Sequence, residues 1–492
     1  MAQERFLLVL DEGTTSTRAM LFNLDGTVAT TAQAELTQYY PADGYVEHDA
    51  AEIWDRTLGC ARKMLKKAGG ADRIAAIGIT NQRETVVAWD KRSGQPVCRA
   101  IVWQDRRTAE ACDRLRAEGF EMLIRQRTGL ELDPYFSGTK MRWILENVPE
   151  AAGLGSDLAF GTVESWLVWK LTGGLHISDA TNASRTMLMP LDGPSWDPEL
   201  LDLLGVPVGA LPEIVDSAGN FGATLPELFG APIPICGLAG DQQAATIGQN
   251  CLLPGQVKAT LGTGAFVLAS TGHELPRSEN RLLGTVLAQC NGKRIYALEG
   301  SVFVAGSLVK WLRDQIGLIS TATESEDLAR SVPDNAGVCI IPALAGLGAP
   351  HWRPDARGLI SGLTQGTTRA HIVRAALESM AHQMNDLKRA YAADSSPWAM
   401  LRLDGGMSAN DWISQDLADI LDIPVERPAN VETTALGAAM LASVGYGLDE
   451  SLEAAGRMRG HSASFHSTMD GTTRQKRLNL WRTCLSLELD RG

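Results

Sequence analysis

A short stretch near the N-terminus combines the side-chain types that bind phosphate. It reads Asp11-Glu12-Gly13-Thr14-Thr15-Ser16-Thr17-Arg18. Gly13 permits a tight turn and a close approach of the backbone to a ligand, and Thr14, Thr15 and Ser16 offer hydroxyls beside their amides. Arg18 adds a fixed positive fork, and Asp11 can hold a magnesium ion, usually through water, that bridges phosphate oxygens. The stretch predicts a phosphate-binding turn with Asp11 as the metal-side acid, although an ordinary hairpin turn uses the same residue types.

Two further turns suit a nucleotide. Leu261-Gly262-Thr263-Gly264 supplies another glycine-flanked hydroxyl without an acid, so Thr263 would clamp the far side of a phosphate chain beside a single metal site. Asp404-Gly405-Gly406 follows an apolar run and leads through Met407 to Asn410 into a helical pattern. Paired glycines let a flat ring or a phosphate lie against backbone at the start of a helix, but a turn of this kind alone is commonly structural.

The first two turns each join two apolar runs, which predicts two β-hairpins of the same form. The runs are FLLVLDEGTTSTRAMLF near the N-terminus and VKATLGTGAFVLAS at Val257 to Ser270. This repeat predicts two related domains facing each other across a cleft. We expect residues 1-252 to form the N-terminal domain and 253-492 the C-terminal domain, with the boundary at the turn-like Pro254-Gly255.

Short apolar runs alternate with helical patterns along the chain, which is typical of an α/β fold. Strands are expected at 5–10, 73–79, 85–89, 234–239, 258–261, 338–342 and 401–403. Helices are expected at 50–67, 371–391 and 411–421. In the last of these, Ile413, Leu417, Ile420 and Leu421 recur at helical spacing. The fold class predicted is mixed α/β.

The composition disfavours several classes of partner. The chain has 492 residues, enough for at least two domains with cores of their own. With 45 basic and 58 acidic residues its net charge is -13, so it lacks the basic surface that nucleic acid requires. The apolar core Leu7 to Leu10 is too short for a signal peptide, and the run Val338 to Pro350 is too short and interrupted for a membrane span. Eight scattered cysteines without a CxxC pair suit free thiols. We expect a soluble, cytoplasmic protein.

The phosphate-binding motifs point to one family. The sequence contains neither a P-loop nor a strand-to-helix GxGxxG. It resembles, nearly end to end, the FGGY carbohydrate kinases, and within them the members that phosphorylate glycerol. The resemblance rests on DEGTTSTR (11–18), GITNQRET (78–85), DPYFSGTK (133–140), TNASRTML (181–188), GLAGDQQAA (237–245), LGTGAF (261–266), YALEGSVFVAG (296–306), IPALAGLGAP (341–350) and LDGGMSAN (403–410). It implies two related domains of the actin-like and ribonuclease H-like ATPase fold, with nucleotide and substrate in the cleft between them.

The resemblance also implies the ligands and their contacts. ATP and glycerol would be the small-molecule ligands, Mg²⁺ a cofactor, and a homodimer or homotetramer the assembly. The glycerol pocket would consist of Arg83, Glu84, Trp103, Tyr135, Asp241, Gln242 and Phe266. The nucleotide would contact Thr14, Thr15, Ser16, Arg18, Thr263, Gly306, Gly406 and Asn410, with the metal at Asp11. The residue types of the glycerol pocket suit this substrate. The hydroxyls of glycerol need many hydrogen-bond donors and acceptors, and its carbons need flat apolar walls such as Trp103 and Phe266.

Phosphoryl transfer requires in-line positioning, charge neutralisation and a base for the hydroxyl proton. The resemblance implies that Asp241 takes the proton from a terminal hydroxyl of glycerol, while magnesium near Asp11 and Arg18 stabilises the developing charge. The products would be sn-glycerol 3-phosphate and ADP, the first step of glycerol use.

Other interpretations stay open for single residues and for the whole chain. Asp241 could be a helix N-cap, Arg83 and Glu84 a surface ion pair, and Tyr135 and Trp103 core aromatics. The substrate could be another sugar or polyol such as xylulose, ribulose or gluconate. More remotely, paired Gly-Thr hairpins also occur in actin-like and Hsp70-like ATPases, whose nucleotide drives partner binding.

Overall fold

The first predicted hairpin opens a five-stranded sheet. In the computed structural model, which describes residues 5–490, β1 (Phe6–Glu12) pairs antiparallel with β2 (Ser16–Asn23) and parallel with β6 (Ile74–Asn81). The strand order is β13-β6-β1-β2-β3, with β13 (Ile235–Gly240) and β3 (Val28–Glu35) at the edges. Every residue of β6 and β13 is buried, because helices cover both faces of this parallel part of the sheet.

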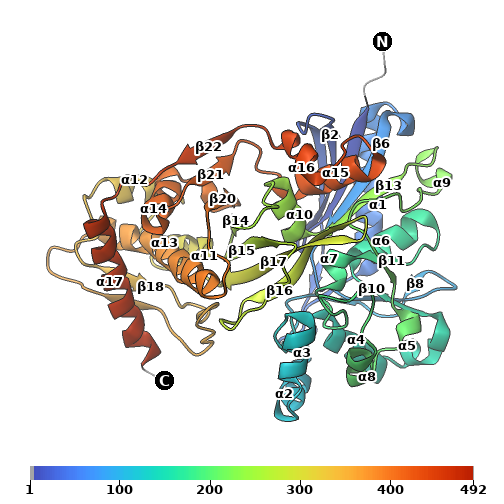
Figure 1. Ribbon diagram of the computed structural model, residues 1–492, viewed down its shortest axis with the longest axis horizontal. Helices are drawn as coiled ribbons and strands as arrows, with labels where there is room; N and C mark the ends of the chain where they lie inside the picture. Colours follow the sequence, from blue (N-terminus) through green and yellow to red (C-terminus); the bar gives the residue numbers. More distant parts are fainter. Residues whose placement is uncertain (1–4, 491–492) are drawn as a thin grey trace.

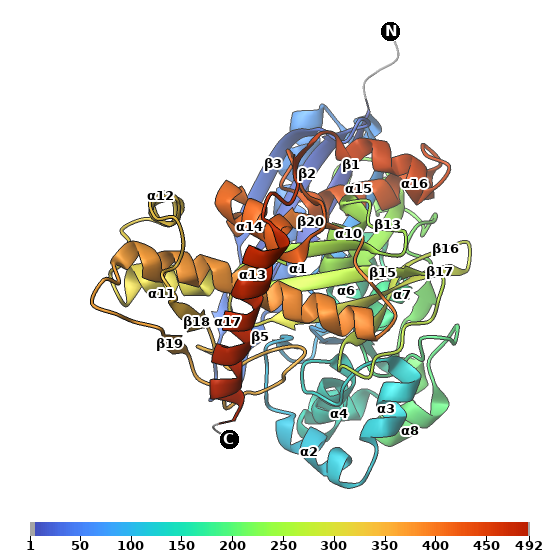
Figure 2. The same ribbon diagram turned by 60° about the vertical axis from the view of Figure 1, so that its left-hand side comes forward.

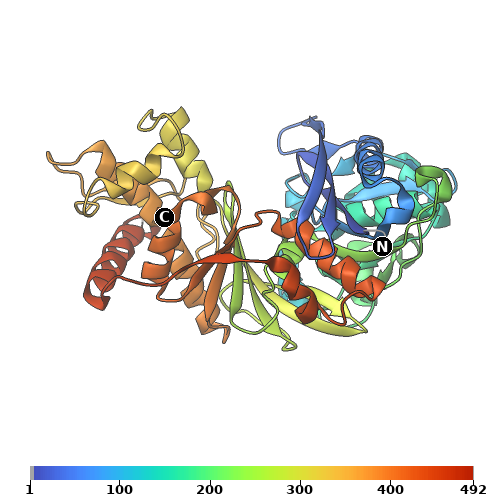
Figure 3. The same ribbon diagram turned by 90° about the horizontal axis from the view of Figure 1, so that it is seen from above.

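Helices from both halves of the sequence cover this sheet. On one face lies α1 (Ala50–Ala68), whose N-cap Asp49 accepts the amides of Ala51 and Glu52. On the other face lie α10 (Asp241–Gly248) and α15 (Thr433–Tyr446), and α15 packs directly on β1, β6 and β13. Figure 3 shows α15, coloured red, beside the blue N-terminal strands. The C-terminal half of the chain therefore completes the core of the N-terminal lobe.

Glycines allow α10 and α15 to cross with their backbones in contact. A Cβ atom on Gly437 would lie 1.8 Å from the carbonyl oxygen of Ala244, and one on Gly248 would lie 2.0 Å from that of Thr433. Real Cβ atoms do not approach so closely, so neither position has space for a larger residue. The crossing fixes α15 against the helix that begins at Asp241.

The second predicted hairpin forms the middle of a seven-stranded sheet in the other lobe (Figure 1). β14 (Gln256–Leu261) pairs antiparallel with β15 (Ala265–Gly272) and parallel with β20 (Met400–Asp404). The order is β16-β17-β15-β14-β20-β21-β22. The outer strands are β16 (Leu283–Cys290), β17 (Lys293–Val302), β21 (Val425–Pro428) and β22 (Ser462–Phe465). The side chain of Val286 on β16 packs with Ala180 and Ala183 of α7 (Ala180–Ala183) in the N-terminal lobe, which joins the lobes on this side.

Long helices cover the second sheet. The main ones are α11 (Gly306–Asp314), α13 (Arg369–Ala393), α14 (Asp411–Leu421) and α17 (Gly471–Leu489). Figure 2 shows α17 crossing α13, and there the rings of His382 and Trp481 stack at 5.3 Å. The core beneath them includes Val257, Leu401 and Leu417.

The remaining elements form small sheets and loops around the lobes. In the N-terminal lobe they are β4 (Gln38–Tyr39), β5 (Glu47–His48), β7 (Val87–Asp90), β8 (Gln95–Pro96), β9 (Ala100–Ile101), α2 (Ala109–Ala117), α3 (Glu121–Thr128), α4 (Ser137–Asn147), α5 (Pro149–Leu154), β10 (Leu158–Gly161), α6 (Val163–Thr172), β11 (Ile177–Asp179), α8 (Pro198–Leu204), β12 (Glu213–Val215) and α9 (Pro226–Phe229). In the C-terminal lobe they are α12 (Glu324–Arg330), β18 (Cys339–Ile341) and β19 (Leu359–Ser361). The short helix α16 (Leu452–Ala455) packs beside α15 on the core of the N-terminal lobe.

The predicted strands and helices are confirmed, with ends shifted by a few residues. The boundary at residue 253 falls between α10 and β14 and stays a prediction, since α15 returns from beyond it to the first lobe. Within residues 5–490, no helix combines the length and apolar character that crossing a membrane requires.

Candidate active site

Asp241 is the first residue of α10 and directly follows β13. The N-cap of this helix is Gly240, so the N-cap interpretation of Asp241 is wrong. About a third of the Asp241 side chain is exposed, and its Oδ1 lies 3.3 Å from Nε of Arg83. The same oxygen accepts the amide of Gln242 at 2.7 Å. Burial raises the pKa of Asp241, and the charges of Arg83 and Lys258 oppose this rise. A partly exposed carboxylate with a raised pKa has the chemistry of a general base.

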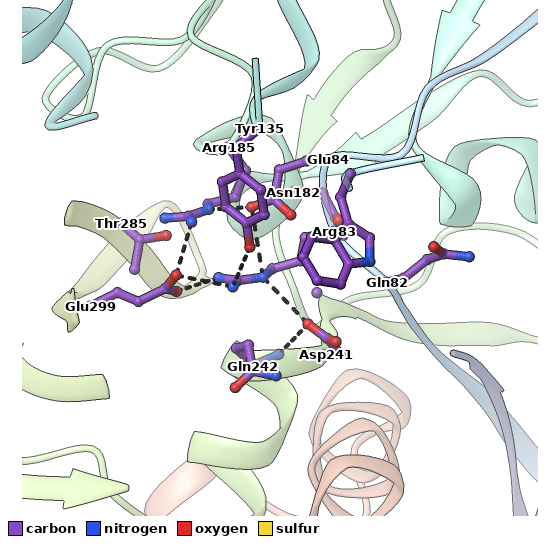
Figure 4. Close-up of polar contacts among 12 residues, drawn as sticks. Gln82, Arg83, Glu84, Tyr135, Asn182, Arg185, Asp241, Gln242, Thr285 and Glu299 are labelled. Carbon is purple, nitrogen blue, oxygen red and sulfur yellow. Dashed lines mark hydrogen bonds and ion pairs between the residues drawn. The ribbon is translucent and has the colours of Figure 1, made fainter. Parts of the chain in front are cut away.

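Beside Asp241 is an arginine–carboxylate cluster made of Arg83, Glu84, Arg185 and Glu299 (Figure 4). Arg83 forms a two-pronged pair with Glu299, at 2.5 Å from Nη1 and 3.1 Å from Nη2. Arg185 donates to Glu84 at 2.7 Å and to Glu299 at 3.0 Å. All four residues are buried, so Arg83 and Glu84 are not a surface ion pair.

The charges in this cluster balance one another. Burial alone would raise the pKa of Glu299, but Arg185 and Arg83 outweigh burial and lower it to about 2. For Glu84 burial dominates over the two arginines and raises the pKa. Glu299 comes from β17 of the second lobe, whereas both arginines come from the first. The cluster therefore ties the two lobes together.

The backbone at Glu84 is held in an unusual conformation. Its φ is 62°, a region that non-glycine residues rarely adopt. Its carbonyl accepts Oγ of Ser137 at 3.2 Å and Nζ of Lys140 at 3.3 Å, both from α4. These bonds and the ion pair to Arg185 keep the Glu84 carboxylate in the cluster, as expected for strain maintained at a functional site.

Two aromatic side chains connect the cluster to the phosphate turn. The hydroxyl of Tyr135 accepts a long hydrogen bond, 3.5 Å, from Arg83. The ring of Trp103 packs edge to face against Tyr135, with centroids 5.6 Å apart. The indole Nε1 of Trp103 donates to Oγ1 of Thr14 at 3.0 Å. Trp103 therefore contacts both the proposed substrate wall and the proposed phosphate turn.

The first turn, with Thr14 and Thr15, lies between β1 and β2. The amide of Gly13 donates to the carbonyl of Ser16 at 3.0 Å, which closes the turn around Thr14 and Thr15. Arg18 lies opposite Asp11 in the register of the hairpin, forms an ion pair with it, and reaches Glu432 at 2.5 Å. Glu432 immediately precedes α15.

Asp11 suits only a magnesium site in which water and phosphate oxygens supply most of the ligands. Among residues 5–490 there is no group of three or more His, Cys, Asp or Glu side chains placed to hold a metal. Magnesium in nucleotide sites, however, commonly needs only one or two carboxylates besides water and phosphate oxygens. Asp11 is buried at the end of β1. Burial raises its pKa and Arg18 opposes this rise. A nearby dication would favour the ionised form in the same way.

The second turn and the start of α11 lie together. The amide of Gly306 donates to the carbonyl of Gly262 at 2.9 Å, and that of Ser307 donates to Thr263 at 3.0 Å. A Cβ atom on Gly306 would lie 2.5 Å from the Gly262 oxygen. The side chain of Thr263 is exposed, so it is available to a ligand.

The double-glycine turn packs against the end of β14. A Cβ atom on Gly405 would lie 2.6 Å from the carbonyl oxygen of Leu261, and Gly406 faces open space. Asn410 is the N-cap of α14, where its side chain accepts the amide of Ile413 at 3.1 Å. The capping role explains the presence of Asn410 without a ligand. Gly406 is accessible, beside the second turn.

Strand register places Phe266 on the same face as two buried charges. It lies opposite Thr260 on β14 and Ser301 on β17. Side chains two residues apart on a strand share a face, so Phe266 shares its face with Lys258 and Glu299. Phe266 is only partly buried, so part of its side chain is accessible.

The sequence reasoning missed several charged residues of this site. Glu299, Arg185, Lys258 and Glu432 received no role, although Arg185 and Glu299 stand in two of the quoted motifs. A usable signal was a charge inside an otherwise apolar strand, as with Lys258 in VKATL and Glu299 in YALEG. The pairing of Arg83 with Glu299, 216 positions apart, has no local signature.

Comparison with known proteins identifies relatives along the whole chain. Family models of the FGGY carbohydrate kinases match as the N-terminal domain over residues 6–248 and the C-terminal domain over 257–446. A glycerol kinase of Methylobacterium nodulans is 52% identical over 99% of both chains. A crystal structure of Plasmodium falciparum glycerol kinase with ADP has a TM-score of 0.95 at 35% identity, covering 99% of this chain and 98% of the other. A xylulose kinase structure from Rhodospirillum rubrum has a TM-score of 0.87 at 26% identity, covering 98% of each chain. The two-domain, mixed α/β sugar-kinase fold predicted from the sequence is confirmed.

Proposed function

The chain belongs to the FGGY family of carbohydrate kinases, and we propose that it transfers the γ-phosphoryl group of ATP to glycerol, giving sn-glycerol 3-phosphate and ADP. The observation that supports this most is the 52% identity, over nearly full length, to a protein named glycerol kinase. The polar side chains around Asp241 agree with it. The sequence expectation of a polyol kinase rests on these same residues.

The proposed glycerol pocket combines charged groups with aromatic walls. Arg83 and Glu84 offer donors and an acceptor that are already ordered by buried ion pairs. Asp241 and Gln242 line the start of α10, and the rings of Trp103 and Tyr135 stand edge to face beside them. A pocket of fixed polar groups rejects analogues that lack a hydroxyl, because its buried donors would lose their partners.

In the proposed mechanism Asp241 accepts the proton of a terminal hydroxyl as that oxygen attacks the γ-phosphorus. Thr14, Thr15, Ser16 and Arg18 bind phosphate oxygens from the first turn. Thr263, Gly306, Gly406 and Asn410 form the nucleotide side. Magnesium held at Asp11 would neutralise charge on the phosphates. Closure of the two lobes would exclude water that otherwise takes the phosphoryl group.

A substrate panel tests this proposal. The purified protein is incubated with MgATP and glycerol, dihydroxyacetone, erythritol or xylulose, and ADP release is followed by a coupled assay. Glycerol is expected to give the highest kcat/KM. Preference for xylulose would indicate another substrate class within the family, and full ATP hydrolysis without any alcohol would indicate an ATPase of the actin or Hsp70 type.

The role of Asp241 is tested by Asp241→Asn. The amide keeps the size of the side chain but is not a base, so turnover should fall at least about 1000-fold while glycerol and ATP still bind. Turnover near the wild-type value would remove Asp241 as the base. The domain boundary at 253, a dimeric or tetrameric assembly and a cytoplasmic location also stay proposals.

A further inference from the structure

Lys258 is a buried lysine at the base of the proposed pocket. It lies on β14, has no exposed surface, and is among the largest fully buried side chains of the protein. Its Nζ donates to Oε1 of Gln242 at 2.7 Å. Lysine is rarely buried without a partner, so this contact between the second lobe and the start of α10 needs an explanation.

The surroundings of Lys258 are mostly acidic. Burial lowers the pKa of its ammonium, and Asp404 of β20 and Asp241 oppose this effect. Glu299 of β17 also favours the charged form, and Arg83 disfavours it. The three carboxylates around the ammonium favour its charged form, but burial has the larger effect and the pKa of Lys258 is lowered overall.

The charges facing Asp241 come from three elements. They are Lys258 of β14, Arg83 of the turn after β6, and Asp11 of β1. Helix α15, which also packs on α10, has no charged side chain. Lys258 is thus one of two cations that lower the pKa of this carboxylate.

The bond to Lys258 also determines which way the Gln242 amide points. A glutamine side chain can rotate its amide by half a turn, exchanging its oxygen and its NH₂ group. With Oε1 bound to the ammonium, only the NH₂ group is left for the cleft. Among the described residues it has no hydrogen-bond partner, and Gln242 is partly exposed. Two N–H donors therefore face the space where an alcohol substrate would lie.

We propose that Lys258 is a positioning residue for phosphoryl transfer, which orients the amide of Gln242 toward the substrate alcohol and keeps a positive charge beside Asp241. This inference rests on the proposed kinase function. A purely structural counter-ion for Asp404 is the competing role, and the two roles differ in what Lys258 does to substrate affinity and to the pH profile.

The test compares the wild type with Lys258→Met, which keeps the length of the side chain without donors or charge. Lys258→Gln is the second variant, because its amide can still donate a hydrogen bond. It provides a folded alternative if Lys258→Met does not fold. For Lys258→Met, KM for the alcohol should rise about tenfold while KM for ATP changes little. Lys258→Gln, whose amide can still donate to Oε1 of Gln242, should raise the alcohol KM less. The acidic limb of the kcat/KM profile should move up by about one pH unit, because an opposite charge near Asp241 is lost.

The matched control is Lys388→Met, a partly buried lysine of α13 whose ammonium donates to the carbonyl of Leu421. It should leave the substrate KM and the acidic limb unchanged. All assays use whichever alcohol the wild type phosphorylates best, so an error in assigning glycerol does not affect this test. Folded Lys258 variants with an unshifted acidic limb and unchanged alcohol KM would overturn the proposal, whatever their stability.

Discussion

Glu299 provides a sharp test of the electrostatics of the site. Its carboxylate pairs with both Arg83 and Arg185, and only 2% of its side chain is exposed. Glu299→Gln keeps the shape and one acceptor oxygen but removes the negative charge. Both arginines then stay buried with a single carboxylate partner in the cluster, Glu84.

The size of the effect follows from the pKa of Glu299. Its folded-state value is about 2, against an ordinary value of 4.5. Each pKa unit corresponds to about 1.4 kcal/mol, so the ionised form contributes about 3 kcal/mol to stability at neutral pH. Because the pKa is depressed, this contribution is complete above the ordinary value and is lost as the pH falls from 4.5 towards 2. The variant should therefore lose about 3 kcal/mol at pH 7, and the gap should narrow below pH 4.5.

The assay is urea unfolding followed by tryptophan fluorescence, together with KM for glycerol. The matched control is Glu426→Gln, because Glu426 also pairs with two arginines, Arg402 and Arg459, but is partly exposed. It lies on β21, and its partner Arg402 donates to the carbonyl of Gln249 at the C-terminal end of α10. The control should lose less than about 1 kcal/mol and leave KM unchanged. The argument that this carboxylate orders the pocket is wrong if Glu299→Gln lowers the free energy of unfolding no more than the control does and leaves KM for glycerol unchanged.

Three further predictions follow. Gly437→Ala should destabilise the protein by at least about 2–3 kcal/mol in urea unfolding, because the new Cβ would overlap a backbone oxygen of α10. The control Gly59→Ala lies in α1 with open space around it and should be neutral or stabilising. Trp103→Phe should raise KM for ATP as well as for glycerol, because Thr14 loses its indole donor; a change for glycerol alone would contradict this link. In a rate profile from pH 4 to 9, kcat/KM should rise with pH through a pKa above the 3.8 of an ordinary aspartate, because burial raises the pKa of Asp241. A profile that stays flat down to pH 4 would argue against this base.

Local patterns were enough to predict the two hairpins and most of the strands. The apolar runs before and after Gly13 and Gly262 form strands where expected, because turn residues and alternating burial act over short distances. The helix at 411–421 is also found with the expected ends, since its capping residue and apolar spacing lie in the same segment.

The sequence did not predict the contacts between distant segments. The TTALGAAMLASVGY segment of α15 predicts a buried helix at most, and nothing in it indicates packing on β1 and β6, more than 350 residues earlier. The site shows the same limit. Arg83 and Asp241 were nominated by resemblance, but Glu299, Arg185 and Lys258 become relevant only when register and burial bring their charges together.

The packing of α15 on the first sheet affects the order in which the protein can fold during synthesis. The strands β1, β6 and β13 leave the ribosome early, but the helix that covers their inner face ends at Tyr446. At roughly 5–20 residues per second, about 10–40 s pass between the end of α10 and the emergence of α15. During that interval the apolar face formed by Leu7, Val9 and Ala76 has no permanent cover. The nascent first lobe is thus a natural client for chaperones until the last fifth of the chain arrives.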